Sequence, residues 1–203
     1  MTDAIRAAGS ALPDEALGQL FRDARSMNGY LDEPVSDALL DQLYGLVASG
    51  PTSTNCQPGR FIFVRTEEHK ARLAACVAPN NKPKVLAAPV TVIVGMDMDF
   101  VEQLPQVFPH ADVRPMYESV PGMIEATAFR NSSLQGGYLI LAARALGLDC
   151  GPMSGFSAEA VDAAFSRGSN VRTNFLCTLG RGDWTRVFPK LQRLSFSDAC
   201  QLI

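Results

Sequence analysis

Polar segments with almost no charged residues, together with a few scattered basic residues, are the parts of this sequence best equipped for chemistry. The polar segments are SGPTSTNCQPGR at 49–60, NSSLQGG at 131–137 and GPMSGF at 151–156. The basic residues that accompany them are Arg25, Lys84, Lys190 and Arg193. Neutral donors suit the edges of a flat heteroaromatic ring, and a few cations suit one phosphate. The pattern favours a cofactor that supplies the redox chemistry itself, so no catalytic acid is required.

Several other kinds of site are not signalled. The sequence contains no G-x-G-x-x-G motif and no Walker loop. Five cysteines without a C-x-x-C pair, and only two histidines, indicate neither a disulfide framework nor a metal site. Ser154 lies in PMSGF rather than in a G-x-S-x-G elbow, and Cys56 has no neighbouring histidine to activate it. We therefore predict no metal and name no catalytic side chain.

Length and composition indicate one folded domain over residues 1–203, with residues 1–12 as a flexible arm. Hydrophobic residues make up 47% of the chain and charged residues 19%. The net charge of -3 argues against nucleic acid as a partner, so any anion site must be local. The N-terminus has no apolar signal core, and the longest apolar run, Val85–Met96, is shorter than the ~20 residues that cross a bilayer. We expect a cytoplasmic protein without a membrane partner.

A long helix over residues 123–146 is the element around which the polar segments are arranged. It carries no charge between Arg130 and Arg144, although its first half is rich in small and polar residues. Such a helix is normally buried, either in a domain core or between two subunits, and small residues suggest close approach of another backbone or a ligand. Gly147 is placed to end the helix. A plain core helix followed by a turn is the alternative.

Helical spacing, capping residues and apolar runs define the remaining elements. Helices are expected from Pro13, after Ser36, from Thr66 to Val77 and after Ser157, with strands at 61–64, 90–94 and 174–179. The strand at 90–94 is apolar on both faces, which is typical of the middle of a sheet. Residues 97–122 are irregular and proline-rich, as in a lid or a binding loop. The polar loop at 49–60 is either a binding loop or an ordinary surface turn.

The chain resembles FMN-dependent nitroreductases from about Leu17 to Gln201. Four segments carry this resemblance in the order typical of the family: ARSMNGYLDEPVSDALL, GPTSTNCQP, NNKPKVLAAPV and ALGLDCGPMSGF. The resemblance implies an α+β fold, a three-layer α/β/α sandwich with a mostly antiparallel central sheet. It also implies a homodimer with two FMN sites at the subunit interface, NADH or NADPH as hydride donor, and a small-molecule acceptor.

The resemblance also implies roles for particular residues. Those expected at the FMN phosphate and ribityl chain are Arg25, Ser26 and Asn28, assisted by Lys190 and Arg193. The partner subunit would contribute Pro51, Thr52, Ser53 and Asn55. The ring edge would meet Asn81 and Lys84, with Asn131 approaching from the long helix. One ring face would be lined by Pro152, Met153, Ser154 and Gly155.

Within the family, further segments are similar to the branch that reduces malonic semialdehyde in the Rut pathway of pyrimidine utilisation. They read PTSTNCQPGRFIFVRT, LPQVFPHAD, AFRNSSLQGGYLI and RLSFSDACQL. This implies hydride transfer through flavin N5 to malonic semialdehyde, giving 3-hydroxypropanoate. A broad nitroaromatic or quinone reductase and a non-catalytic flavin-binding protein are the alternatives. For the proton that the aldehyde oxygen needs, Tyr117, His110 and water remain open, and Arg114 or Arg130 would meet a substrate carboxylate or form a structural salt bridge.

The sequence departs from the family pattern at several positions. Ala24 and Asn28 stand where arginine or lysine is common, and Gly59 stands where an aromatic residue usually follows the Gln-Pro pair. Met153 and Ser154 replace bulkier or acidic residues. Fewer cations would weaken FMN retention, and a different flavin loop would change the substrate.

Overall fold

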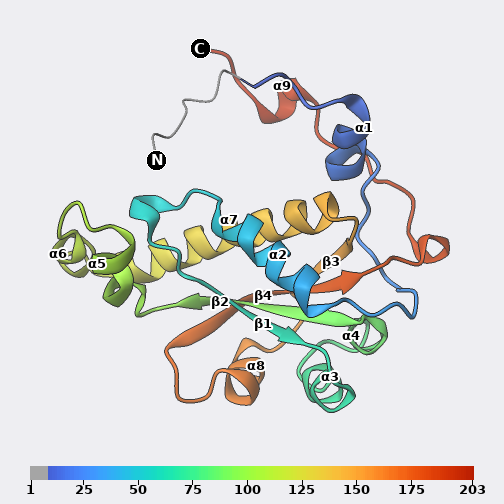
Figure 1. Cartoon of the computed structure of the whole chain (residues 1–203), viewed down its shortest axis with the longest axis horizontal. Helices are drawn as coiled ribbons and strands as arrows, with labels where there is room; N and C mark the ends of the chain where they lie inside the picture. Colours follow the sequence, from blue (N-terminus) through green and yellow to red (C-terminus); the bar gives the residue numbers. More distant parts are fainter. Residues whose placement is uncertain (1–8) are drawn as a thin grey trace.

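A four-stranded antiparallel sheet forms the centre of the protein, in a computed structural model that describes residues 9–203. Its strands are β1 (Gly59–Val64), β2 (Val90–Asp97), β3 (Asp149–Met153) and β4 (Val171–Gly180), in the order β1-β2-β4-β3. Helices α2 (Asp37–Ala48) and α7 (Met123–Ala145) cover one face. The other face is covered by α3 (Glu67–Ala74), α4 (Lys82–Ala87) and α8 (Ala158–Phe165) (Figure 1). The predicted three-layer α/β/α sandwich is confirmed.

Strand β2 lies inside the sheet and separates two parts of the core. Val90, Val92 and Val94 pack in the cluster under α2 and α7, whereas Ile93 packs with residues of α3, α4 and α8. This explains why the stretch 90–94 is apolar throughout, because neither face of an inner strand meets water. The prediction that it belongs to the middle of the sheet is confirmed.

Buried polar side chains of α7 form hydrogen bonds to neighbouring strands of the sheet. The Gln135 amide oxygen accepts a hydrogen bond from Gly59 N–H at 2.7 Å, and Ser132 Oγ accepts one from Asn174 at 2.9 Å. At Gly136, a Cβ atom would lie 2.3 Å from the ring of Phe175, so the glycine permits the close packing of β4. The helix ends as predicted at Gly147, whose φ of +75° favours glycine.

Some elements differ from the expectation. The first helix is a short α1 (Asp14–Leu17) that continues as a π-helical turn, η1 (Gly18–Arg22). Helix α3 ends at Ala74 rather than Val77, because Val77 forms a bridge to Phe156. The region 97–122 holds three short helices, η3 (Phe100–Gln103), α5 (Leu104–Val107) and α6 (Arg114–Glu118), which pack on one another around a small apolar cluster. Short 3-10 turns occur at η2 (Ser53–Asn55) and η4 (Trp184–Arg186).

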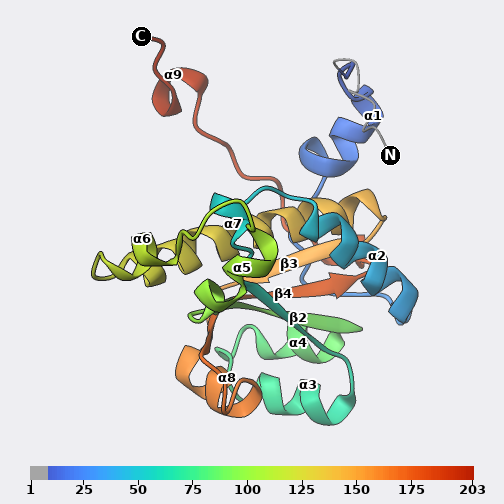
Figure 2. The same cartoon turned by 60° about the vertical axis from the view of Figure 1, so that its left-hand side comes forward.

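The terminal segments stand away from the sandwich on the side of α7. Helix α1 and the last short helix, α9 (Phe196–Ala199), lie above α7 in both views (Figure 1, Figure 2). Of the predicted arm at 1–12, residues 1–8 lie outside the described residues, and 9–12 are exposed coil. No helix within residues 9–203 is long and apolar enough to cross a membrane.

Two buried threonines on neighbouring strands differ in the hydrogen bonding of their hydroxyls, and their contributions to stability can be compared by mutation. Thr91 and Thr178 are register partners, yet Thr91 Oγ1 has no hydrogen-bond partner, whereas Thr178 Oγ1 accepts from Tyr30 and donates to Gly151 O. We expect Thr91→Val to leave stability unchanged or raise it by ~1 kcal/mol, because it removes an unsatisfied polar group. Thr178→Val should cost ~1–3 kcal/mol. Urea unfolding of both variants checks this, and an equal loss in both would contradict it.

Candidate cofactor site

A cavity of about 590 Å³ is lined by basic residues from four separate parts of the chain. Its charged lining residues are Arg22, Arg25, Lys84, Arg144, Lys190 and Arg193. Its other lining residues are Phe21, Ala24, Ser26, Asn28, Phe188, Pro189 and Leu191, and no aspartate or glutamate lines it. The cavity therefore gathers six of the predicted site residues, including all four of the predicted cations, in an acid-free environment.

The segment that carries Arg25, Ser26 and Asn28 is fixed against the edge of β3. Ser26 forms a parallel bridge with Cys150, and Met27 N–H donates to Cys150 O at 2.9 Å. Gly151 makes this approach possible, because a Cβ there would lie 2.8 Å from Met27 O. Tyr30 anchors the end of the segment through its hydroxyl, which donates to Thr178, and burial raises the pKa of that hydroxyl well above its usual range.

The C-terminal segment closes the cavity on its other side. Arg25 donates to Phe188 O at 2.6 Å, and the Lys190 ammonium donates to Arg22 O. In the described part of the chain, Arg25, Lys84, Lys190 and Arg193 form no ion pair, whereas Arg22 pairs with Asp14 at 3.2 Å. Because the chain as a whole carries a net charge of -3, this cluster is a local site suited to an anion.

Two basic residues of the cavity were missed by the sequence prediction. Arg22 is the last residue of η1 and lies three residues before Arg25, so its nearness in the sequence was the available signal. Arg144 comes from the far end of α7 and donates to Leu20 O at 2.8 Å, and no local pattern places it beside Arg25.

The loop at 152–155 is joined to the cavity through α4. Asn81, at the start of α4, is buried and donates from Nδ2 to Gly155 O at 3.0 Å. Lys84, in the first turn of the same helix, lines the cavity. Pro152, Ser154 and Gly155 are exposed, whereas the side chain of Met153 lies in the core between α4 and β4. Met153 can therefore offer a ligand little beyond its backbone.

The predicted residues from the loop at 51–55 lie elsewhere in the same chain. Ser53 N–H donates to Asn131 Oδ1 at 2.9 Å, in the first half of α7. Arg144, which lines the cavity, is thirteen residues further along α7, or roughly 20 Å at the rise of an α-helix. Neither Asn131 nor any residue of 51–55 lines the cavity. One chain thus holds the predicted residues in two separate groups.

The structure also shows the surroundings of four other residues that the sequence offered as candidates for chemistry. They are Cys56, Arg114, Arg130 and His110. Cys56 is buried, and burial raises the pKa of its thiol to about 11, so it is unsuited to act as a nucleophile. Arg114 pairs with Glu102 at 3.1 Å, which is the structural salt bridge considered above. Arg130 and His110 are exposed, and His110 packs edge-on against Phe108. Among residues 9–203, no group of three His, Cys, Asp or Glu side chains is arranged to hold a metal.

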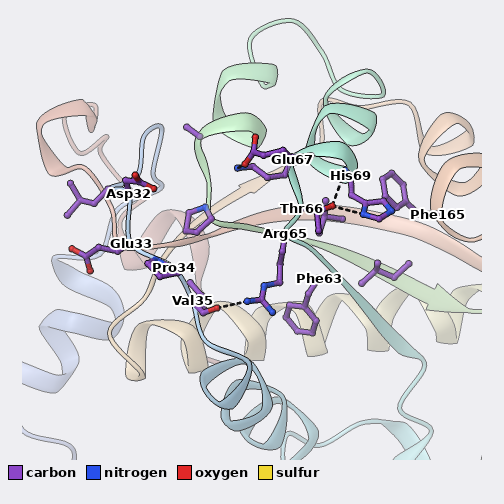
Figure 3. A pocket seen from close by; sticks show the side chains of 16 residues that line it. Asp32, Glu33, Pro34, Val35, Phe63, Arg65, Thr66, Glu67, His69 and Phe165 are labelled. Carbon is purple, nitrogen blue, oxygen red and sulfur yellow. Dashed lines mark hydrogen bonds and ion pairs between the residues drawn. The ribbon is translucent and has the colours of Figure 1, made fainter.

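A second cavity, of about 910 Å³, lies at the free edge of β1 and is lined by none of the predicted site residues. Figure 3 shows Arg65 reaching across it to the backbone oxygen of Val35, with His69 turned toward Thr66. Acidic side chains from Asp32, Glu33 and Glu67 line it together with Arg65 and Lys70. Because its charges are mixed, it lacks the anion preference of the smaller cavity.

Comparison with known proteins identifies the family. The model of the nitroreductase family matches residues 21–181, so the chain belongs to the nitroreductase family. A Burkholderia lata protein with the provisional name NADH dehydrogenase/NAD(P)H nitroreductase is 55% identical over 95% of this chain and 99% of its own. A Stenotrophomonas maltophilia protein of the same name is 53% identical over 95% of this chain and 98% of its own.

Solved structures share the fold. A protein of Exiguobacterium sibiricum, provisionally described as a nitroreductase and solved in complex with FMN, has a TM-score of 0.85 at 24% identity. The match covers 97% of this chain and 100% of that one. A Bacillus subtilis protein provisionally described as a nitroreductase has a TM-score of 0.85 at 23% identity, covering 93% and 99%.

The basic cavity can be tested with FMN as the probe. We expect Arg25→Ala to weaken FMN binding by about 10–100-fold, because a charge-assisted hydrogen bond to a phosphate is lost. Quenching of flavin fluorescence during titration measures the dissociation constant. Arg167→Ala, which removes an exposed arginine after α8, is the matched control and should bind FMN as the unaltered protein does. Equal affinity in both variants would exclude Arg25 from the site.

Proposed function

We propose that this member of the nitroreductase family is an FMN-dependent NAD(P)H oxidoreductase that reduces malonic semialdehyde to 3-hydroxypropanoate in pyrimidine utilisation. FMN, when bound, would accept a hydride at N5 from the nicotinamide and pass it to the acceptor. The names of the relatives in Burkholderia lata and Stenotrophomonas maltophilia support the nicotinamide donor. The FMN complex of the Exiguobacterium sibiricum protein supports the flavin.

The acid-free basic cavity is the single observation that carries this proposal. Its six basic side chains and the polar groups of Ser26 and Asn28 fit a phosphate and a ribityl chain. Ala24 and Asn28 stand where a basic residue is common in the family, and Arg144 adds a positive charge to the cavity that the sequence pattern did not reveal. The charge of Arg22 is offset by its ion pair with Asp14. Arg25, Lys84, Lys190 and Arg193 would hold the phosphate.

The remaining contributions of the protein are positioning and hydrogen bonding. Asn81 holds the carbonyl of Gly155, and so fixes the exposed loop whose backbone N–H groups would face the ring. A preorganised donor stabilises negative charge without reorganisation during the reaction. The proton for the aldehyde oxygen would come from water or from His110, which is exposed.

We further propose that the site is completed in a homodimer. The separation of residues 51–55 and Asn131 from the basic cavity supports this, because a second copy could place its own loop beside the first copy's cavity. Exposed apolar side chains on the same side of the molecule give a surface for such a partner. On α7 they are Phe129 and Leu134, and on the C-terminal segment Phe188, Leu191, Leu194 and Phe196.

A charge placed on this surface should prevent dimerisation. Leu134 on α7 and Leu86 on α4 are 44% and 45% exposed but lie on opposite faces of the sandwich. We expect light scattering to give twice 21.9 kDa for the unaltered protein and for Leu86→Arg. Leu134→Arg should give 21.9 kDa, because a buried unpaired charge is costly. A monomeric unaltered protein would remove the interface from the proposed site.

The proposed reaction is tested by anaerobic absorption spectroscopy of the FMN-loaded protein. Addition of NADPH and then NADH should bleach the flavin bands and identify the donor. Malonic semialdehyde should then restore the oxidised spectrum faster than a nitroaromatic compound or a quinone. Equal reoxidation by all acceptors would favour a broad reductase. Flavin that stays oxidised with both nicotinamides would favour a non-catalytic flavin-binding protein.

A further inference from the structure

The loop that follows α2 adopts a backbone conformation that its residues do not favour. Three of its non-glycine residues have positive φ, namely Thr54 at 45°, Asn55 at 51° and Gln57 at 39°. The left-handed region is unfavourable for most L-residues other than asparagine and aspartate, and the β-branched Thr54 is especially unsuited to it. Contacts from outside the loop must therefore keep it in this shape.

Two neighbouring elements supply these contacts. From α7, Asn131 accepts the Ser53 N–H at 2.9 Å and donates to Thr127 O at 2.9 Å, so its amide is fully oriented. From the region of short helices, Val107 O accepts a hydrogen bond from Asn55 Nδ2 at 2.8 Å. Tyr117 of α6 adds its hydroxyl, which lies 2.7 Å from Thr54 Oγ1.

The direction of the bond between Tyr117 and Thr54 follows from the number of hydrogens available. A hydroxyl has one hydrogen, and that of Thr54 is donated to Ser53 O at 2.8 Å. Thr54 Oγ1 must then accept, so the Tyr117 hydroxyl is the donor. Ser53 Oγ, at 3.5 Å, is left as a weak donor to Tyr117. The Tyr117 proton is thus committed to the loop and is unsuited to donation to a substrate.

The Tyr117 ring is held rigidly, so its hydroxyl is a fixed point. The side chain is 1% exposed and packs edge-on against Phe100, with ring centroids 5.3 Å apart. The surrounding cluster also contains Cys56 and Val101. Because the ring loses no further freedom when its hydroxyl bonds Thr54, this contact is well suited to holding the less stable backbone conformation.

We propose that Tyr117 is a positioning residue for the flavin site. Its hydroxyl holds Thr54 in the left-handed conformation and thereby fixes the backbone of residues 51–55 for contact with the FMN of a second copy. The effect of Tyr117 on FMN binding rests on the proposed function. Its effect on the loop is independent of that function. The short helices of region 97–122 consequently act on the cofactor through the loop at 51–57.

Tyr117→Phe is the direct test, because it keeps the ring and removes the donor. We expect amide hydrogen exchange in residues 52–57 to quicken by about fivefold or more, and the FMN dissociation constant to rise by about 5–10-fold, as for one lost hydrogen bond. Tyr44→Phe is the matched control, because it removes the hydroxyl of a tyrosine on α2 that is 47% exposed and lies outside the cluster around Tyr117. It should leave both the loop exchange and the FMN affinity unchanged.

A glycine at position 54 makes the test specific. Thr54→Gly adopts positive φ without strain, so Tyr117→Phe should have no further effect on FMN affinity in that background. Additive effects would overturn the proposal, as would Tyr117→Phe with unchanged loop exchange or with faster exchange and unchanged FMN affinity. An unaltered protein that takes up no FMN would instead refute the proposed function, while the exchange measurement would still decide whether Tyr117 holds the loop.

Discussion

The need to satisfy buried polar groups on α7 governs the arrangement of the rest of the structure. Asn131, Ser132 and Gln135 are buried, and each must find a hydrogen-bond partner or destabilise the fold. Their partners are the loop after α2, strand β4 and the first residue of β1. A helix of purely apolar residues would pack on the sheet equally well, but it would not specify where these three segments sit. The polar residues thus give orientation, and the apolar contacts give most of the stability.

Local patterns were sufficient to predict much of the fold. The two-sided apolar stretch at 90–94, the caps at Ser36 and Ser157, and the end of α7 at Gly147 all depend on neighbours within a few residues. The helices in region 97–122 were missed because each is short, because α5 and α6 carry a proline that was read as a sign of irregular structure, and because they are held by contacts with one another. The π-helical turn at 18–22 likewise has no signature in its residue types.

The candidate site was predictable to the extent that it follows family motifs. Arg25, Lys84, Lys190 and Arg193 were named from the sequence, and the fold brings them to one cavity. That Arg144 joins them could not be predicted, since it depends on how the end of α7 meets η1. The hydrogen bond from Tyr117 to Thr54 spans 63 residues and was hidden for the same reason. The roles of the residues at 51–55 remain predictions that depend on a second copy.

Two walls of the basic cavity come from opposite ends of the chain. Residues 21–28 precede all four strands, and residues 188–193 follow them. A ribosome releases a chain from its N-terminus at about 5–20 residues per second, and domains fold as they emerge. The first wall would thus wait roughly 8–30 s for the last, and the end of β4 at Gly180 would emerge only about a second before the closing segment. An anionic cofactor bound in this cavity, as proposed, would therefore be taken up only near the end of synthesis, because the cavity lacks its last wall until then.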